Sequence, residues 1–250
     1  MKKEYIKRAS YPTDLTDSQW TVIEPLFVGM REYKYSKREL LNAVLYVVDS
    51  GCKWRQLPHD FPAWQTVYSF FRRANEKGLW DKILEHLVKI IRKKAGRNPN
   101  PSYALIDSQS VKTAYASEQT KGRKRHIAKD TLGCMLALKV HKANLHDTKA
   151  GMFIAIQARR KYPTIKKFCG DSGYRGSFVI NVKTILGLDV DISAKIIPQG
   201  WIIVPKRWIV ERTFAWLNHS RRLSKDYEIL TSCAESMIKL SHLHSLLNRL

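Results

Sequence analysis

The spacing of apolar residues changes at a short segment rich in proline and asparagine, residues 96–101. Before this segment apolar residues recur at three- and four-residue intervals, the period of helices that bury one face. After it, short apolar runs alternate with helical patterns, which is typical of an α/β sheet domain. The change predicts a helical N-terminal domain over residues 1–96, a linker over 97–102 and a second domain over 103–250.

Capping signatures mark two helix starts in the first domain. Thr16 is followed by Gln19, and Ser36 by Glu39, at the spacing of a capping box. Gly51 stands where the second of these helices should end.

Two more helices are predicted in this domain, over about residues 64–76 and 80–94, with Gly78 ending the first of them. Short helices with basic outward faces, such as the one that carries Arg72 and Arg73, favour a helix-turn-helix-like DNA-binding domain. A helical cap with a solvated polar face fits the same pattern.

Strands and helices alternate in the second domain. Apolar runs predict strands over residues 103–107, 135–140 and 165–169. Helical patterns lie at about 147–160, 174–186, 208–223 and 232–248. The expected fold class is therefore α/β, with helices flanking a sheet.

The chain carries 44 lysines and arginines against 22 aspartates and glutamates, a formal net charge of +22. Such an excess favours a polyanionic partner, with nucleic acid as the first candidate. No apolar run approaches the roughly 18 residues of a membrane span, and the N-terminus does not read as a signal peptide. We therefore expect no membrane partner. The four cysteines are scattered, so we also expect no zinc ribbon or disulfide framework and a cytoplasmic location.

Three acids stand at positions that suit a catalytic site. Asp107 ends a predicted strand, and Asp171 lies between Gly170 and Gly173 after another. On the last but one predicted helix, Glu211 shares a polar stripe with Arg207, opposite a wide apolar face. A strand-end aspartate is also a common turn or helix cap, and Glu211 with Arg207 could be a plain ion pair.

Carboxylates from separate elements are the ligands that hard divalent cations such as Mg²⁺ prefer. Two such ions about 3.5–4 Å apart can activate an attacking oxygen and stabilise a leaving oxygen in phosphoryl transfer. Asp147 follows His146 at a predicted helix start. We interpret it as the N-cap of that helix rather than as a fourth ligand.

Several motifs resemble the DDE transposases of bacterial insertion sequences, most closely the insertion-sequence-five family within the insertion-sequence-four group. They are Asp107-Ser-Gln-Ser-Val-Lys-Thr113, Lys121-Gly-Arg-Lys-Arg-His-Ile127, Gly170-Asp-Ser-Gly-Tyr-Arg-Gly176 and the segments 207–217 and 221–228. Residues 15–20 and 51–58 are similar to that family's leading domain. The resemblance covers nearly the whole chain.

The resemblance implies a ribonuclease H-like catalytic core in which Asp107, Asp171 and Glu211 hold two Mg²⁺ or Mn²⁺ ions. It implies cleavage of the terminal inverted repeats of the element and attack of the freed 3′-OH on target DNA. Arg207 matches the arginine of the broader group's signature, but Val204 and Asn218 stand where that signature has tyrosine and lysine. Arg222 is a candidate replacement for the missing lysine.

The partners implied are double-stranded DNA, both terminal repeats and target, and a second copy of the chain in a homodimer on DNA. The basic run that begins at Lys121 reads either as a solvated turn or as a contact to DNA phosphates, and its nearness to Asp107 favours contact. The predicted DNA-binding residues are Arg72, Arg73, Lys112, Lys121, Arg123, Lys124, Arg125, Arg207 and Arg222.

Two other functions fit the sequence. A catalytically impaired or domesticated copy could act as a DNA-binding repressor of its element; the segment between Thr113 and Lys121, which looks shorter than in the family, favours this alternative. A ribonuclease or repair nuclease with the same fold is the third. The intact acids favour the transposase.

Overall fold

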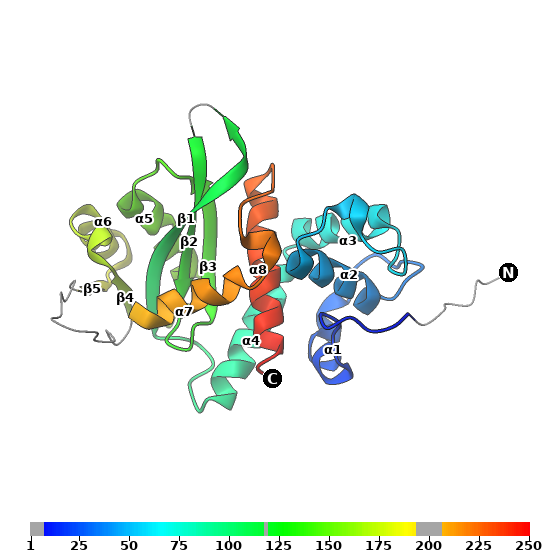
Figure 1. The fold of residues 1–250 in the computed structure, drawn as a ribbon. Coiled ribbons are helices and arrows are strands. Elements are labelled where there is room, and N and C mark those ends of the chain that lie inside the picture. Colours follow the sequence, from blue (N-terminus) through cyan, green and yellow to red (C-terminus); the bar gives the residue numbers. More distant parts are fainter. Residues whose placement is uncertain (1–7, 118–119, 194–206) are drawn as a thin grey trace, which may run out of the picture.

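The computed structural model describes residues 8–117, 120–193 and 207–250. Within these ranges a group of helices from the first part of the chain lies beside a five-stranded sheet with its own helices (Figure 1). Helices α4 (Leu79–Lys94) and α8 (Thr231–Leu247) lie between the two groups.

The helical elements follow the capping signals closely. They are α1 (Asp17–Ile23), α2 (Lys37–Ser50), α3 (Trp64–Glu76), α4 and the short 3₁₀ turns Glu24–Phe27 and Trp54–Gln56. Thr16 completes a reciprocal capping box with Gln19, and the Ser36 side chain caps α2. Gly51 ends α2 at a φ of 72°, a left-handed conformation that glycine adopts without strain. Gly78 was expected to end α3. The C-cap of α3 is instead Lys77, and Gly78 is the N-cap of α4.

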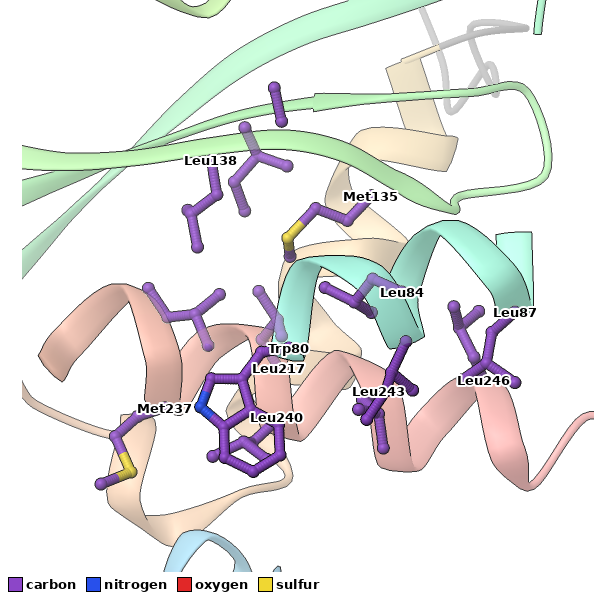
Figure 2. Close-up of a cluster of buried hydrophobic side chains, with 14 of the residues drawn as sticks. Trp80, Leu84, Leu87, Met135, Leu138, Leu217, Met237, Leu240, Leu243 and Leu246 are labelled. Carbon is purple, nitrogen blue, oxygen red and sulfur yellow. The ribbon is translucent and has the colours of Figure 1, made fainter. Parts of the chain in front are cut away.

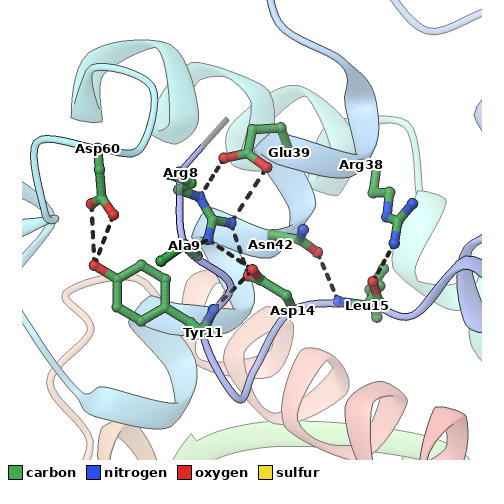
Figure 3. Close-up of polar contacts among 9 residues, drawn as sticks. All are labelled: Arg8, Ala9, Tyr11, Asp14, Leu15, Arg38, Glu39, Asn42 and Asp60. Atoms are coloured by element: carbon green, nitrogen blue, oxygen red, sulfur yellow. Dashed lines mark hydrogen bonds and ion pairs between the residues drawn. The ribbon is translucent and has the colours of Figure 1, made fainter. Parts of the chain in front are cut away.

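Arg8 ties the start of the described chain to α2 (Figure 3). Its guanidinium donates to Asp14 and to Glu39, each at 2.7 Å. The same group lies 4.1 Å from the centre of the Phe61 ring, and the neighbouring Tyr11 hydroxyl donates to Asp60. These contacts fix the segment before α1 onto the helical group.

The sheet has the strand order β3-β2-β1-β4-β5. Its strands are β1 (Tyr103–Ser117), β2 (Thr120–Lys129), β3 (Met135–Lys142), β4 (Lys167–Gly170) and β5 (Asp189–Ile192). The first three pair antiparallel, whereas β4 pairs parallel with both β1 and β5. This mixed sheet flanked by helices confirms the predicted α/β fold class.

Two strands were not predicted. The basic run at Lys121 lies in β2 rather than in a turn, and β5 has too few residues for a clear alternating pattern. The first strand also continues well past Asp107 because its outer half pairs with β2.

The remaining helices cover the sheet on both faces (Figure 1). Helix α5 (Asp147–Lys161) packs on β1, β2 and β3, while α7 (Arg207–Asn218) packs on β1 and α8 on β3. The short α6 (Ser177–Asn181) continues into a π turn over Val182–Leu186. The predicted helix over residues 208–223 is too long: it ends at Asn218, and the 3₁₀ turn Arg221–Leu223 follows a bend at Ser220.

The two groups of elements share buried apolar surface (Figure 2). Leu84 and Leu87 of α4 meet Leu240, Leu243 and Leu246 of α8, with β3 above them. Buried Arg92 of α4 also pairs with Asp130, which follows β2. The linker therefore connects two regions whose facing surfaces are packed together. That these regions are two domains with separate functions, divided at residues 97–102, stays a prediction. No helix within the described ranges is long and apolar enough to cross a bilayer.

His242 of α8 supplies a pH-sensitive contact in this core. Its Nε2 accepts a hydrogen bond from the Met135 backbone amide at 2.9 Å. Burial, followed by the charges of Arg249 and Lys129, lowers the pKa of His242 from 6.5 to about 3. The imidazole is therefore neutral in the folded protein at physiological pH.

We expect the free energy of unfolding to fall as the pH drops from about 6.5 toward 3, because only the unfolded chain binds this proton there. The slope contributed approaches about 1.4 kcal/mol per pH unit. Buried His126, with its pKa lowered to about 4, contributes in the same direction. Urea unfolding at several pH values should show a shallower slope in His242→Gln than in the wild type, with His59→Gln, an exposed control, unchanged. An unchanged slope in His242→Gln would contradict the assignment.

Candidate active site

The parallel pairing of β1 with β4 brings two of the predicted acids together. Leu105 pairs with Cys169, and Asp107 and Asp171 each lie two residues further along their strands. Asp107 is half-buried within β1, and one oxygen of its carboxylate accepts the Ser108 amide at 2.7 Å. Asp171 is exposed just beyond β4. Equal offsets on neighbouring parallel strands place both side chains at the same sheet edge.

Asp171 shapes the turn in which it lies. Its Oδ1 accepts the Gly173 amide at 2.9 Å, and its carbonyl accepts the Tyr174 amide at 3.1 Å. This caps the 3₁₀ turn Ser172–Tyr174 that follows β4. The capping role that the sequence left open for a strand-end aspartate is thus present.

Tyr174 lies under the two acids in a tight slot. A Cβ atom on Gly151 of α5 would lie 2.7 Å from its ring, and one on Gly170 of β4 would lie 2.9 Å from it. The Tyr174 hydroxyl is hydrogen-bonded to His126 Nε2 at 2.7 Å. Burial raises the pKa of Tyr174, and the negative charges of Asp107, Asp147 and Asp171 raise it further. The hydroxyl therefore stays protonated among three carboxylates.

The third of these carboxylates, Asp147, was expected to cap α5, but that expectation is wrong. The N-cap is His146, whose Nδ1 accepts the Thr148 amide. Asp147 instead turns toward the sheet, where its Oδ1 accepts from Ser108 Oγ and Lys124 Nζ, each at 3.0 Å. An acid in the first helical turn after a strand was the only signal in the sequence for this position.

Lys124 also holds Asp147 ionised. Burial acts to raise the pKa of Asp147, but the hydrogen bonds from Lys124 and Ser108 and the charge of Lys124 outweigh it, so that the pKa lies below its usual value. The centre thus contains three acids and one directly paired lysine among the described side chains.

Glu211 is placed only by its backbone. It lies in the first half of α7, a helix that packs on β1, and the side chains of Glu211 and Arg207 fall outside the described residues. Val204 falls there too. Among the described residues no three His, Cys, Asp or Glu side chains are close enough to form a metal site by themselves. Asp107 and Asp171 do offer the oxygen donors that Mg²⁺ takes, so a third donor from α7 would complete a site.

The predicted DNA-binding cations divide into two groups. Arg123 donates to Asp226, and buried Arg125 donates to the Leu223 carbonyl, with burial lowering the pKa of Arg125 to about 10. Arg222 lies in the 3₁₀ turn after α7, not within a continuous helix over residues 208–223 as predicted, and pairs with Glu228. In the described structure these guanidinium groups hold the segment 221–230 against the sheet and α2.

Two of the other predicted cations are exposed. Lys112 is exposed on β1, and Arg72 on α3 is exposed beside Glu76. Arg73 donates to the Tyr33 hydroxyl. Lys121 lies in β2, with its side chain outside the described residues. The β1–β2 hairpin that carries these lysines projects beyond the rest of the sheet (Figure 1).

The mixed sheet flanked by helices thus carries Asp107, Asp147 and Asp171 around one buried tyrosine. A family model described as the transposase DDE domain matches residues 98–237, more than half of the chain. A second, described as a putative transposase of the IS4/5 family, matches residues 15–84. The chain belongs to the DDE transposases of the IS4/5 family.

Two related proteins come from Burkholderia cepacia, and each is 29% identical to this chain over 126 residues. One is an uncharacterized 16.2 kDa protein of insertion element IS402; the match covers 46% of this chain and 84% of that protein. The other is a putative transposase for insertion sequence element IS402, with 48% and 60% covered. The chain thus spans about three fifths of the length of the second relative.

Similar solved structures include the catalytic domain of Mos1 mariner transposase, at 12% identity and a TM-score of 0.37 over 66% of this chain and 87% of that one. A Mos1 mariner paired end complex with Mn is 13% identical, with a TM-score of 0.32 over 88% of this chain and 78% of that one.

The tight packing around the Tyr174 ring leads to a testable prediction. Gly151→Ala should lower the free energy of unfolding by about 1–3 kcal/mol, because the added methyl overlaps the Tyr174 ring and outweighs the gain in helix propensity. Urea denaturation measures the change. In a Tyr174→Leu background, where the ring is absent, the same substitution should cost clearly less. An equal cost in both backgrounds would show that the ring is not what excludes the methyl.

Proposed function

We propose that this protein cuts the terminal inverted repeats of its own insertion sequence and joins the freed 3′-OH ends to target DNA. The observation that carries the proposal is the placement of Asp107 within β1 beside Asp171 just after the parallel strand β4, inside a region that matches the transposase DDE domain. Glu211 belongs to the same matched region and lies on the helix that packs on β1.

Asp107, Asp171 and Glu211 would hold two Mg²⁺ or Mn²⁺ ions. When bound, such ions lower the pKa of an attacking water or hydroxyl and neutralise charge on the phosphate and the leaving oxygen. Asp107 is oriented by the Ser108 amide and Asp171 by the Gly173 amide. The chain's contribution would be to orient these carboxylates toward one point.

Binding of double-stranded DNA rests on the net charge of +22 and on where the accessible cations lie. We assign phosphate contacts to Lys112 and Lys121 on the β1–β2 hairpin and to Arg72 on α3, with Arg207 near the acids. Arg73, Arg123, Lys124, Arg125 and Arg222 have partners inside the protein, so a contact from them to DNA would require those partners to be exchanged. Cutting two ends of one element would require a homodimer on the DNA.

We expect Asp107→Asn, Asp171→Asn and Glu211→Gln each to lower Mg²⁺-dependent cleavage of an end-containing duplex by about a hundredfold or more. Affinity for the duplex, measured by fluorescence anisotropy in Ca²⁺, should stay within about threefold. Asp17→Asn, a control on exposed α1, should cleave as the wild type does.

Wild-type activity in any of the three variants would contradict the assignment of the acids. Specific end binding by a wild type that never cleaves would favour the repressor. Cleavage without preference for the terminal repeats would favour a general nuclease.

A further inference from the structure

We propose that Asp147 is a positioning residue of the catalytic centre: together with Lys124, Ser108 and Tyr174 it holds Asp107 and Asp171 in place before a metal ion binds. This inference rests on the proposed function, because it assigns a role within the same centre. It adds a residue outside the three expected acids, located on α5 rather than on the strands or α7.

One oxygen of Asp147 connects three elements. Asp147 lies in the first turn of α5, and its Oδ1 accepts from Ser108 on β1 and from Lys124 on β2, each at 3.0 Å. Ser108 directly follows Asp107 and donates its amide to the Asp107 carboxylate at 2.7 Å. With the Ser108 hydroxyl held by Asp147, both the backbone and the side chain of Ser108 are engaged, which restricts the rotation of Asp107.

The side of the centre that carries Asp171 is held through Tyr174. His141 Nδ1 lies 2.8 Å from the Lys142 carbonyl, which can only accept, so this nitrogen carries the proton. His141 Nε2 is hydrogen-bonded to His126 Nδ1, also at 2.8 Å. His126 Nε2 in turn lies 2.7 Å from the Tyr174 hydroxyl and 3.4 Å from Asp147 Oδ1.

This hydrogen-bond chain connects Tyr174 through His126 and His141 to the Lys142 carbonyl. It fixes the Tyr174 ring between Gly151 and Gly170, and the Tyr174 amide in turn donates to the Asp171 carbonyl. The turn that presents the Asp171 carboxylate is thereby anchored from beneath.

Repulsion among the carboxylates explains why these positioning contacts are needed. Three carboxylates close to one tyrosine hydroxyl repel one another in the absence of a cation, and each would swing outward to relax. Lys124 neutralises Asp147 directly and lies on the strand next to Asp107. Partners that orient metal ligands in this way commonly change metal affinity about 10- to 100-fold when they are removed.

The test is Mn²⁺ affinity of the full chain, measured without DNA by electron paramagnetic resonance of free Mn²⁺. We expect Asp147→Asn to raise the Kd about tenfold or more, and the Mg²⁺ concentration at half-maximal cleavage to rise in parallel. Ser108→Ala should raise the Kd in the same direction, while Ser108→Thr, which keeps the hydroxyl, should restore it.

The matched control is Asp81→Asn on α4. Asp81 is also a partly exposed carboxylate paired with lysines, Lys161 and Lys239, but it lies outside the centre. This variant should bind Mn²⁺ as the wild type does. Thermal denaturation of every variant separates loss of fold from loss of affinity; if Asp147→Asn does not fold, the Ser108 pair decides.

Each alternative result has its own meaning. Wild-type Mn²⁺ affinity in a folded Asp147→Asn overturns the inference and leaves the proposed function intact. Weak binding in Asp147→Asn with normal binding in Ser108→Ala also overturns it, because Asp147 would then act as a direct ligand. Absence of Mn²⁺ binding and of cleavage by the wild type would refute the proposed function and the inference with it.

Discussion

The parallel pairing of β1 with β4 is the constraint on which the candidate centre depends. It fixes Asp107 and Asp171 at one sheet edge, where two negative charges face each other at a cost that increases as water is excluded. Contacts within the centre reduce this electrostatic cost. Backbone amides orient both acids, and Lys124 places a positive charge against the third carboxylate, Asp147.

The excess of positive charge serves two purposes that composition alone does not separate. Arg123 and Arg125 on β2 donate to the segment 221–230, and Arg222 within it donates to the Cys52 carbonyl just after α2, so that they fasten the segment to β2 and to the helical group. Lys112 remains at the surface of the hairpin. The basic residues behind the net charge of +22 therefore have two roles. Some join α7, the sheet and the helical group, and others form a surface for a polyanion.

Sequence analysis predicted the features that short-range chemistry decides. Ser36 and Gly51 bracket α2 as expected because capping depends on neighbours within a few residues. It missed β2, a polar and basic strand that exists only because β1 and β3 pair with it on either side. It misassigned Asp147 for a similar reason, since the contacts with Ser108 and Lys124 join positions far apart in the chain.

The central claim is that Asp107 within β1, Asp171 just after β4 and Glu211 on α7 form a two-metal centre. Anomalous diffraction from crystals soaked in Mn²⁺ tests it most directly. The account predicts two peaks about 3.5–4 Å apart, with Asp107 and Asp171 as ligands and Glu211 completing the shell. Well-ordered crystals in saturating Mn²⁺ with no peak at this sheet edge, or with peaks only elsewhere on the protein, would contradict it.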